Sequence, residues 1–576
     1  MTERTNGFRS APLIVSILGA ILLAGFWMRI GNLGGPDFGV DETFHVYAAQ
    51  QLIAGEYPLL PSGLPYDRSL PYTRTVAWSG ALFGGVNEWT ARLPSVLFGC
   101  LSILVVFLIG WRWYSATAGL VAAWVMAVAP MQISHSRQAR MYALFQLLYL
   151  IIIYLLYQGV EASSQATRPW IPAKLEAWRR RLEIRPELLV IAVLIIFLTR
   201  QIHDLILPSL AGPATYILCM GVVVPFVRDV TPLTRRKYRT AAALLATGVL
   251  LVLGLDVGGV REMLASAYSY APTWAQPRAN DWRYYVNSLG EGYPTIFSTF
   301  LLASVFALTR NWKATLYLLA CFTAPFLLHS FLFAWKETRY ILHIMPLMFI
   351  VFGVGISAFL SSFHLFLTAW AKQALRANPQ KVAGALIVAA VMFLFAATKE
   401  LREGVKLHNV DVGMFAEVQH FNWKKAMEFI ATRATADDVI ITSRSLAARY
   451  YGPKLPSYLL NHQELDSIVN YFPRNKDGQP LDYSTRALII LNLDMLRDVI
   501  AKHSSGWFVT ERPQLGSASI PNELAHFIAR HLSEEPVPEA EDMAVFSWGH
   551  EKRLDPSSFS ASTASPVVSI KSSRKD

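Results

Sequence analysis

Two adjacent carboxylates, Asp41 and Glu42, follow the first hydrophobic segment of the chain. A carboxylate in this place can remove a proton from a hydroxyl or an amine, or can bind a divalent metal ion. Acidic residues also favour the first turn of a helix, so the pair is equally typical of the start of a surface helix. His45 is the one histidine close to the pair in sequence, which disfavours a metal site without excluding it.

Basic residues recur in two pairs with a spacing of three positions, Arg137 with Arg140 and Lys336 with Arg339. In a helix this spacing puts both side chains on one face. Two cations on one face suit a phosphate or pyrophosphate group. Such residues can also mark the end of a membrane helix, with the charge reaching the interface. Arg92 adds a further cation at the start of a predicted span.

A third charged motif, Asp67-Arg68, lies in a loop that also contains Arg74. On residue types alone we interpret it as a solvated ion pair of the loop. Exposed pairs of this kind contribute little to stability and need no functional explanation.

The composition is that of a polytopic membrane protein. Of the 576 residues, 53% are hydrophobic and 16% are charged, well below the roughly 25% charged residues of soluble domains. The net charge of +11 is explained by basic cytoplasmic loops rather than by nucleic-acid binding. Three cysteines, all in apolar runs, predict neither a disulfide framework nor a zinc site.

The hydropathy pattern predicts eleven membrane spans, since about 20 apolar residues cross a bilayer. The first, 11–29, is interpreted as a retained span because no clear cleavage site follows it. Residues 30–90 then form an outer loop with one or two short helices on the membrane surface. The other spans are predicted at 92–111, 117–133, 141–158, 188–202, 207–227, 241–258, 293–309, 314–333, 341–361 and 382–398.

The basic clusters predict the orientation in the membrane. With a cytoplasmic N-terminus, the connections 159–187, 228–240, 310–313 and 362–381 all lie inside. The first, second and last of them carry the densest groups of Lys and Arg. The carboxylate pair, the loop pair and the cations around 92, 137–140 and 336–339 then lie outside. The arginines there oppose the positive-inside bias, which favours a functional reason for them.

Residues 399–553 predict an extracytoplasmic α/β domain. Segments 438–442 and 487–491 are typical of buried strands, and segments 421–434, 493–503 and 521–533 of amphipathic helices. The domain has no Gly-rich phosphate loop, so no catalytic role is assigned to it. Residues 1–398 form the transmembrane domain, and the Ser-rich tail 554–576 is predicted to be disordered.

Several motifs together resemble the GT-C membrane glycosyltransferases, in particular family 39 and the aminoarabinose-transferase-like enzymes. Asp41-Glu42 resembles the acidic motif of their first outer loop, and Asn87 to Ser95 the start of their second span. Ser136 to Leu144 is similar to an A-R-x-A-R-P-Y-A-L segment, with Met141 where proline is usual. Lys336 to Pro346 is similar to an R-Y-x-L-P-x-x-P segment, with His343 where the first proline stands. The loop Tyr66 to Pro71 looks like a diverged F-E-K-P-P.

The resemblance implies a polytopic α-helical fold of the GT-C type. It also implies transfer of a hexose or pentose from a polyprenyl-phosphate donor to an extracytoplasmic lipid, polysaccharide or protein, with inversion at the anomeric carbon. Asp41 would be the general base and Glu42 would orient it or the acceptor. Further substrate-site candidates are Asp67, Arg68, His45 and Tyr340. The donor phosphate would be held by Arg92, Arg137, Arg140, Lys336 and Arg339.

The residues favour no cofactor, although a divalent metal stays possible because some relatives use one. A phosphate leaves as an anion, so one carboxylate base suffices for the transfer, in contrast to the two carboxylates of glycoside hydrolases. The membrane is expected to be a bacterial plasma membrane, with the active site and the C-terminal domain outside.

Two other classes of protein fit parts of the pattern. A transporter or lipid flippase has many spans, but its charges lie near the membrane midplane and its halves are repeated. A non-catalytic scaffold would bind a partner through its C-terminal domain, and Asp41→Asn would leave the activity of its complex intact.

Overall fold

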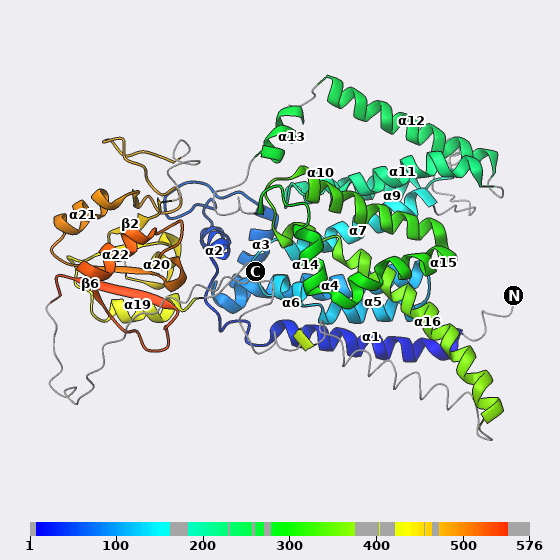
Figure 1. Cartoon of the computed structure of the whole chain (residues 1–576), viewed down its shortest axis with the longest axis horizontal. Helices are drawn as coiled ribbons and strands as arrows, with labels where there is room; N and C mark the ends of the chain where they lie inside the picture. The colour runs from blue at the N-terminus through cyan, green and yellow to red at the C-terminus, as the bar shows by residue number, and fades with distance from the viewer. Residues whose placement is uncertain are drawn as a thin grey trace.

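The computed structural model describes residues 7–161, 183–227, 231–255, 260–269, 278–374, 402–403, 421–453, 455–462 and 472–550. A bundle of long helices forms one end of the molecule and a β-sheet with its own helices the other (Figure 1). The bundle contains α1 (Gly7–Ile30), α4 (Glu88–Trp113), α5 (Ala116–Val128), α6 (Pro130–Ser136), α7 (Tyr142–Glu161), α9 (Pro186–Arg200), α10 (Ile206–Ser209), α11 (Ala211–Val223), α15 (Pro294–Leu327) and α16 (Met345–Ala374). Helices α12 (Pro232–Gly254), α13 (Val260–Ser269) and α14 (Tyr284–Gly292) connect α11 to α15.

Six of the described helices are long and apolar enough to cross a membrane, or seven if the bent pair α5–α6 is one span. The prediction of a multi-span helical membrane protein is confirmed, but the predicted number of eleven is not reproduced. The segment 188–202 corresponds to α9, which has 15 residues and falls short of the roughly 20 that a bilayer needs. Segment 241–258 falls largely in α12, which is not among the six, and 382–398 lies outside the described residues.

Helix α15 covers most of the two spans predicted at 293–309 and 314–333, and the turn η4 (Leu328–Leu332) continues the second. The backbone of α15 leaves the helical region at Asn311, with φ −152° and ψ 86°. The Asn311 amide donates to the carbonyl of Trp113 at the end of α4, and its carboxamide oxygen caps the second half by accepting from the N–H of Ala314. The halves are therefore two helical segments joined at one capping residue.

A proline bends the chain just before the predicted cationic turn. Pro130 has no N–H, so the carbonyl of Met126 loses its helical partner, and α5 and α6 meet at 60°. The buried guanidinium of Arg29 donates to Met126 at 3.0 Å and to the next carbonyl, that of Ala127, at 2.8 Å. The N–H of Met131, the usual partner of Ala127, donates instead to the Tyr293 hydroxyl. These bonds fix the direction of the chain toward residues 137–141.

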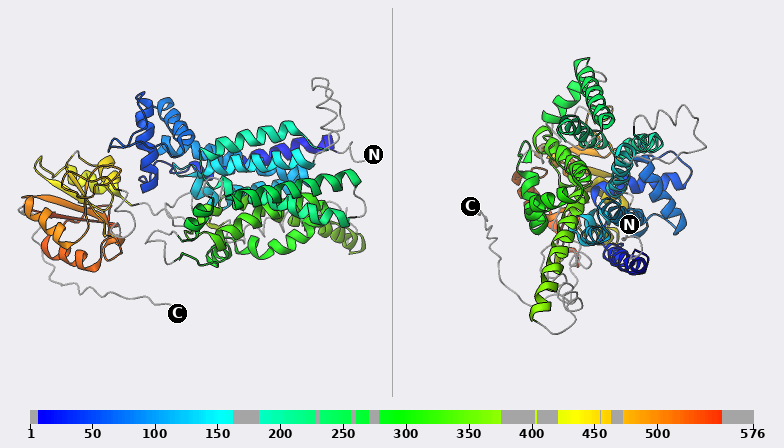
Figure 2. Two further views of the ribbon diagram at one scale, coloured as in Figure 1. Left: turned by 90° about the horizontal axis from the view of Figure 1, so that it is seen from above. Right: turned by 90° about the vertical axis from the view of Figure 1, so that its right-hand side faces the viewer.

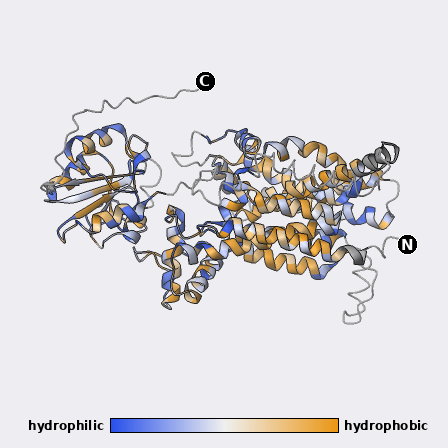
Figure 3. Cartoon of the chain, turned by 90° about the horizontal axis from the view of Figure 1, so that it is seen from below, coloured by the Kyte–Doolittle hydropathy of each residue, from blue (hydrophilic) through white to orange (hydrophobic). Residues whose placement is uncertain are grey.

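The outer loop contains two helices, α2 (Val40–Ile53) and α3 (Leu70–Leu82), as predicted. Both lie between the bundle and the sheet (Figure 1). Hydrophobic residues dominate the long helices, whereas hydrophilic residues are frequent around α2 and α3 and over the sheet (Figure 3).

The C-terminal part folds as a six-stranded sheet in the order β3-β2-β1-β4-β6-β5. Strands β1 to β4 are parallel to one another, and β6 runs antiparallel to both of its neighbours, β4 and β5. Their bounds are β1 Val439–Thr442, β2 Ser457–Leu460, β3 Leu488–Ile490, β4 Gly506–Glu511, β5 Ser533–Glu534 and β6 Met543–Trp548. The helices are α19 (Trp423–Ala431), α20 (Ser445–Tyr451), α21 (Leu493–Lys502) and α22 (Asn522–His531). We call these elements the sheet domain.

Alternation along the strands builds two hydrophobic layers, one on each side of the sheet. Ile440 packs with α19 and α20, whereas the next residue, Ile441, packs with α21 and α22. The predicted α/β domain is thus confirmed, and the expected strands and helices coincide with β1, β3, α19, α21 and α22. Strands β2, β4 and β6 and helix α20 were not predicted. The proposed boundary at residue 399 and the tail 554–576 fall outside the described residues.

The sheet domain lies at the end of the molecule where α2 and α3 are found (Figure 2), and hydrogen bonds join it to the outer loops. The backbone N–H of Phe38 donates to the Tyr451 hydroxyl at 2.8 Å, and the N–H of Lys424 donates to Asp37 Oδ2 at 2.7 Å. A third bond joins the N–H of Ser62 to the carbonyl of Ser484. The domain therefore contacts the segment that leads directly into α2.

Candidate active site

Helix α2 begins at the predicted acidic pair, so one helix start carries both carboxylates. Gly39 is the N-cap, and its N–H donates to Oε2 of Glu42 at 2.8 Å. Glu42 is buried, and its Oε1 also accepts from the N–H of Ala139 at 2.6 Å. Glu42 thus satisfies the first turn of its own helix, and it binds the turn that carries Arg140.

Arg92 pairs with Glu42 and has no free donor for a phosphate. Its Nε and Nη2 donate to the two oxygens of Glu42, each at 2.9 Å. The remaining N–H groups donate to the carbonyls of Leu33, Pro36 and Asp37. A guanidinium has five N–H donors, and all five are used in a buried site. We therefore withdraw the donor-phosphate role expected for Arg92 and assign it the structural role of holding the loop before α2.

Asp41 forms ion pairs with two arginines from distant segments. Its Oδ2 lies 2.8 Å from Arg140 Nη1 and 3.2 Å from Arg339 Nη1. The Asp41 side chain stays 46% exposed, whereas those of Arg140 and Arg339 are 7% and 14% exposed. Burial disfavours the carboxylate charge, but Arg140 and Arg339 outweigh it and lower the pKa of Asp41 to about 2.

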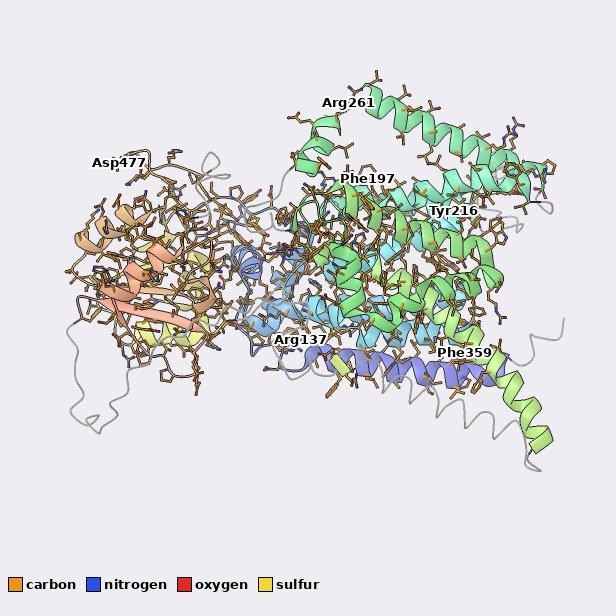
Figure 4. All side chains as sticks on the ribbon, in the orientation of Figure 1. Arg137, Phe197, Tyr216, Arg261, Phe359 and Asp477 are labelled. Atoms are coloured by element: carbon orange, nitrogen blue, oxygen red, sulfur yellow. The ribbon has the colours of Figure 1, made fainter. Side chains whose placement is uncertain are left out.

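Arg137 does not join this group. Helix α6 ends at Ser136, and residues 137–141 form an irregular turn, so the expected common helix face does not exist. Nη2 of Arg137 donates to the carbonyl of Gly31 at the end of α1, at 2.8 Å. Figure 4 shows Arg137 beside α1. The geometry supports a phosphate-binding role for Arg140 but not for Arg137.

Lys336 is fully buried and is satisfied by backbone groups. Its ammonium donates to the carbonyls of His329, Ser330 and Phe333, at 2.7 to 3.0 Å. These carbonyls belong to the π-helical turn η4 (Leu328–Leu332) and the residue that follows it, where α15 ends. Lys336 therefore caps a helix end, and the expected role in phosphate binding is not supported. Its predicted partner Arg339, in the 3-10 turn η5 (Thr338–Ile341), does reach the site.

Aromatic rings line the arginine pair. The guanidinium carbons of Arg140 and Arg339 lie 5.5 Å and 5.9 Å from the ring centre of Tyr142. Arg339 also lies 5.7 Å from the ring centre of Tyr340, one of the predicted substrate-site residues. Such contacts orient the guanidinium planes. Tyr142 was not among the predicted site residues, although it lies within the segment 136–144 that resembles the family motif.

The remaining predicted site residues, Asp67, Arg68 and His45, lie outside the ion-paired group of Asp41, Arg140 and Arg339. Asp67 and Arg68 are exposed, and among the described residues no ion pair joins them. The charge of Arg68 nevertheless acts on Asp41 and lowers its pKa, after the larger effects of Arg140 and Arg339. His45 is buried one helical turn after Asp41, with Nδ1 2.9 Å from the Thr73 hydroxyl. Burial, then the charges of Arg140 and Arg68, hold its pKa well below the ordinary value, so it is neutral.

No three His, Cys, Asp or Glu side chains among the described residues are arranged to hold a metal ion. Asp41 is instead bonded to two guanidinium groups, which are ligands for oxyanions. The arrangement can bind a phosphate at Arg140 and Arg339 and can accept a proton at Asp41.

Comparison with known proteins agrees with this chemistry. Residues 71–227 match the family model described as dolichyl-phosphate-mannose-protein mannosyltransferase. Over this segment the chain is similar to membrane glycosyltransferases of that family. Among curated proteins none matches this chain in sequence. The matched segment contains Arg92, Arg137 and Arg140 but neither Asp41 nor Arg339.

Solved structures share the fold of this chain over most of its length. ArnT from Cupriavidus metallidurans, solved bound to undecaprenyl phosphate, is 15% identical and has a TM-score of 0.54. The alignment covers 94% of this chain and 98% of ArnT. The oligosaccharyltransferase AglB from Archaeoglobus fulgidus, solved with an inhibitory peptide and a dolichol-phosphate, is 11% identical. It has a TM-score of 0.56, with 87% of this chain and 70% of AglB covered.

Proposed function

We propose that this enzyme moves a sugar from a polyprenyl-phosphate donor to an acceptor on the extracytoplasmic side of a bacterial plasma membrane, with inversion at the anomeric carbon. One observation carries the proposal: a half-exposed carboxylate, that of Asp41, is bonded to two buried arginines at the end of a membrane-spanning bundle. The bound lipids of ArnT and AglB, undecaprenyl phosphate and dolichol-phosphate, support the class of donor.

Arg140 and Arg339 are the proposed phosphate ligands. Asp41 forms an ion pair with each of them, so its carboxylate occupies the place that the donor phosphate would take. A donor phosphate that approaches the same guanidinium groups shares their hydrogen bonds and takes part of their charge. The developing negative charge on the leaving phosphate is then stabilised by donors that are already in place.

Asp41 is the proposed general base. When the phosphate occupies the arginines, the carboxylate loses part of the attraction that keeps its pKa near 2, and its affinity for a proton rises. The acceptor hydroxyl transfers its proton to Asp41 while its oxygen attacks the anomeric carbon. The bond from that carbon to the phosphate oxygen breaks, and polyprenyl phosphate leaves with the electron pair. Glu42 acts indirectly, through the Gly39 and Ala139 N–H groups that it holds.

The opposite end of the bundle supports the proposed orientation. Lys237 and Lys313 lie around Glu161 at the end of α7, with Lys313 Nζ 3.2 Å from Glu161 and Lys237 bonded to the carbonyl of Val160. These belong to the basic connections expected in the cytoplasm. The sheet domain and helix α2, which contains Asp41, lie at the other end (Figure 1). We therefore propose that residues 399–553 are extracytoplasmic and border the acceptor site.

The test is release of polyprenyl phosphate from a radiolabelled undecaprenyl-phosphate sugar by the full chain in lipid nanodiscs, with a membrane extract as the source of acceptor. The wild type is expected to release the lipid phosphate and to label an extracted acceptor. Asp477→Asn is a matched control, because Asp477 is exposed on the far part of the sheet domain (Figure 4). Lack of release from every hexosyl and pentosyl donor would contradict the proposed function.

A further inference from the structure

Three histidines next to the arginine pair have buried ring nitrogens without hydrogen-bond partners. His203 follows α9, His329 lies in η4, and His343 precedes α16. Among the described residues, His203 Nε2, His343 Nδ1 and both ring nitrogens of His329 find no partner. A buried polar atom without a partner loses the hydrogen bonds that it makes in water, so a group of four such atoms indicates a ligand or water that satisfies them.

The tautomer of His343 follows from its neighbours. Nε2 of His343 lies 2.6 Å from Ser209 Oγ. Ser209 donates its single hydroxyl hydrogen to the carbonyl of Leu205, also at 2.6 Å. Its oxygen must therefore accept from His343, which places the proton of the imidazole on Nε2. The unpartnered Nδ1 of His343 is then a hydrogen-bond acceptor.

His203 has the complementary arrangement. Its Nδ1 accepts from the N–H of Leu205 at 3.1 Å, so the proton of a neutral ring lies on Nε2. The unpartnered Nε2 is then a donor. Burial lowers the pKa of His203 to about 3, with the positive charges of Arg68, Arg140 and Arg339 acting in the same direction, so the ring is neutral. A neutral His329 adds one donor and one acceptor.

The histidines are linked to the proposed phosphate site by shared rings. Tyr142, which lies against Arg339, is 5.4 Å from the ring of His203. Phe145 touches the rings of both His203 and His343, at 5.5 Å and 4.9 Å. Tyr340, next to Arg339 in the chain, stacks with His329 at 6.2 Å. A single aromatic side chain, Tyr142 or Tyr340, therefore contacts both Arg339 and a histidine of the cluster.

We infer that His203, His329 and His343 form a subsite for the sugar of the donor. The cluster presents donors and acceptors in equal number and without charge, which fits hydroxyl groups, since each hydroxyl both donates and accepts. A phosphate needs donors only and is served by the arginines. A sugar attached to a phosphate at Arg140 and Arg339 lies within reach of the cluster. The inference rests on the proposed function, and it makes the cluster a determinant of donor specificity.

The experiment measures dissociation constants of the full chain in nanodiscs for undecaprenyl phosphate, undecaprenyl-phosphate mannose and undecaprenyl-phosphate arabinose. His343→Phe keeps the ring packing and removes the acceptor, and His343→Asn restores an acceptor near the position of Nδ1. His526→Phe, an exposed change in α22, is the control. We expect the wild type to bind at least one sugar-bearing lipid more tightly than the bare lipid. His343→Phe should weaken that lipid about tenfold, the effect of one lost hydrogen bond, and leave the bare lipid unchanged.

The possible results separate this inference from the proposed function. Recovery of affinity in His343→Asn supports a direct hydrogen bond to the sugar. Equal weakening of the bare and sugar-bearing lipids in His343→Phe would overturn the inference, because the cluster would then serve the fold or the phosphate. Unchanged affinity for all lipids in His343→Phe would overturn it too, as would a wild type that does not distinguish the lipids. Failure of the wild type to bind any of the three lipids would instead contradict the proposed function.

Discussion

Oδ2 of Asp41 lies 2.8 Å from Nη1 of Arg140, and this ion pair joins the first outer loop to the turn between α6 and α7. The same oxygen also binds Arg339, so one carboxylate compensates two guanidinium groups. The Asp41 carboxylate pairs with Arg140 and Arg339, and a donor phosphate that binds the same arginines competes with it. Catalysis depends on this exchange of partners.

The first prediction concerns which arginines bind the donor. Arg339→Gln and Arg140→Gln should each weaken binding of undecaprenyl phosphate by about tenfold or more, because a charge-assisted hydrogen bond is lost. Arg137→Gln should leave the affinity close to that of the wild type, since Arg137 binds the carbonyl of Gly31. Isothermal titration of the variants in nanodiscs measures the difference. An Arg137→Gln variant that binds as weakly as Arg339→Gln would show that the turn rearranges with donor.

A second prediction tests whether Arg92 stabilises the fold or binds the donor phosphate. Arg92→Lys keeps the charge but cannot make the two bonds to Glu42 and the three to backbone carbonyls. Breaking a buried pair costs about 3–5 kcal/mol when one partner is left unpaired, so the thermal midpoint should fall clearly. The folded fraction should still bind undecaprenyl phosphate with wild-type affinity. A stable variant that has lost only this affinity would restore the phosphate-binding role first expected for Arg92.

The third prediction is a pH dependence of the contact between the loop and the sheet domain. Burial raises the pKa of Asp37, which accepts the N–H of Lys424, to about 6. The folded protein thus holds this proton more tightly than the unfolded chain does, with its ordinary value near 4. The associated stability is present below about pH 4 and is lost as the pH rises through 6, by at most about 1.4 kcal/mol per pH unit.

Thermal midpoints of the wild type and of Asp37→Asn between pH 4 and pH 7 measure this dependence. The neutral amide cannot titrate, so the difference between the two proteins should change across this range in favour of Asp37→Asn as the pH rises. Parallel pH profiles for the two proteins would show that Asp37 does not titrate there.

Much of the fold was predictable because its signals are local. Long apolar runs predicted the bundle, and the β-branched run before α20 predicted β1. The number of spans was not predictable in this way. Asn311 ends one helical segment and caps the next within a single element, and α9 is apolar but short. Strands β2 and β6 were missed because their sequences, SYLL and MAVFSW, lack the β-branched runs that mark β1 and β3.

Site residues could be predicted where their charge determines their partner. They could not be predicted where the side chain is bound by backbone groups instead. Asp41, Arg140 and Arg339 were expected on one side of the membrane, and the structure brings them together. Lys336 and Arg92 have the same charge and similar positions, but carbonyl groups and Glu42 use all their donors. A sequence lists the cations and not the carbonyls that surround them. The histidine cluster was missed because its members lie in three distant segments.

The roles of Asp41 as base and as competitor of phosphate are tested together by measuring turnover and lipid binding of Asp41→Asn. The change removes the base and also removes the charge that competes with phosphate for Arg140 and Arg339. We predict that release of undecaprenyl phosphate from the sugar donor is lost, while bare undecaprenyl phosphate binds several-fold more tightly to the variant than to the wild type. Normal turnover in Asp41→Asn, or weaker binding of the lipid phosphate by a folded variant, would contradict this prediction.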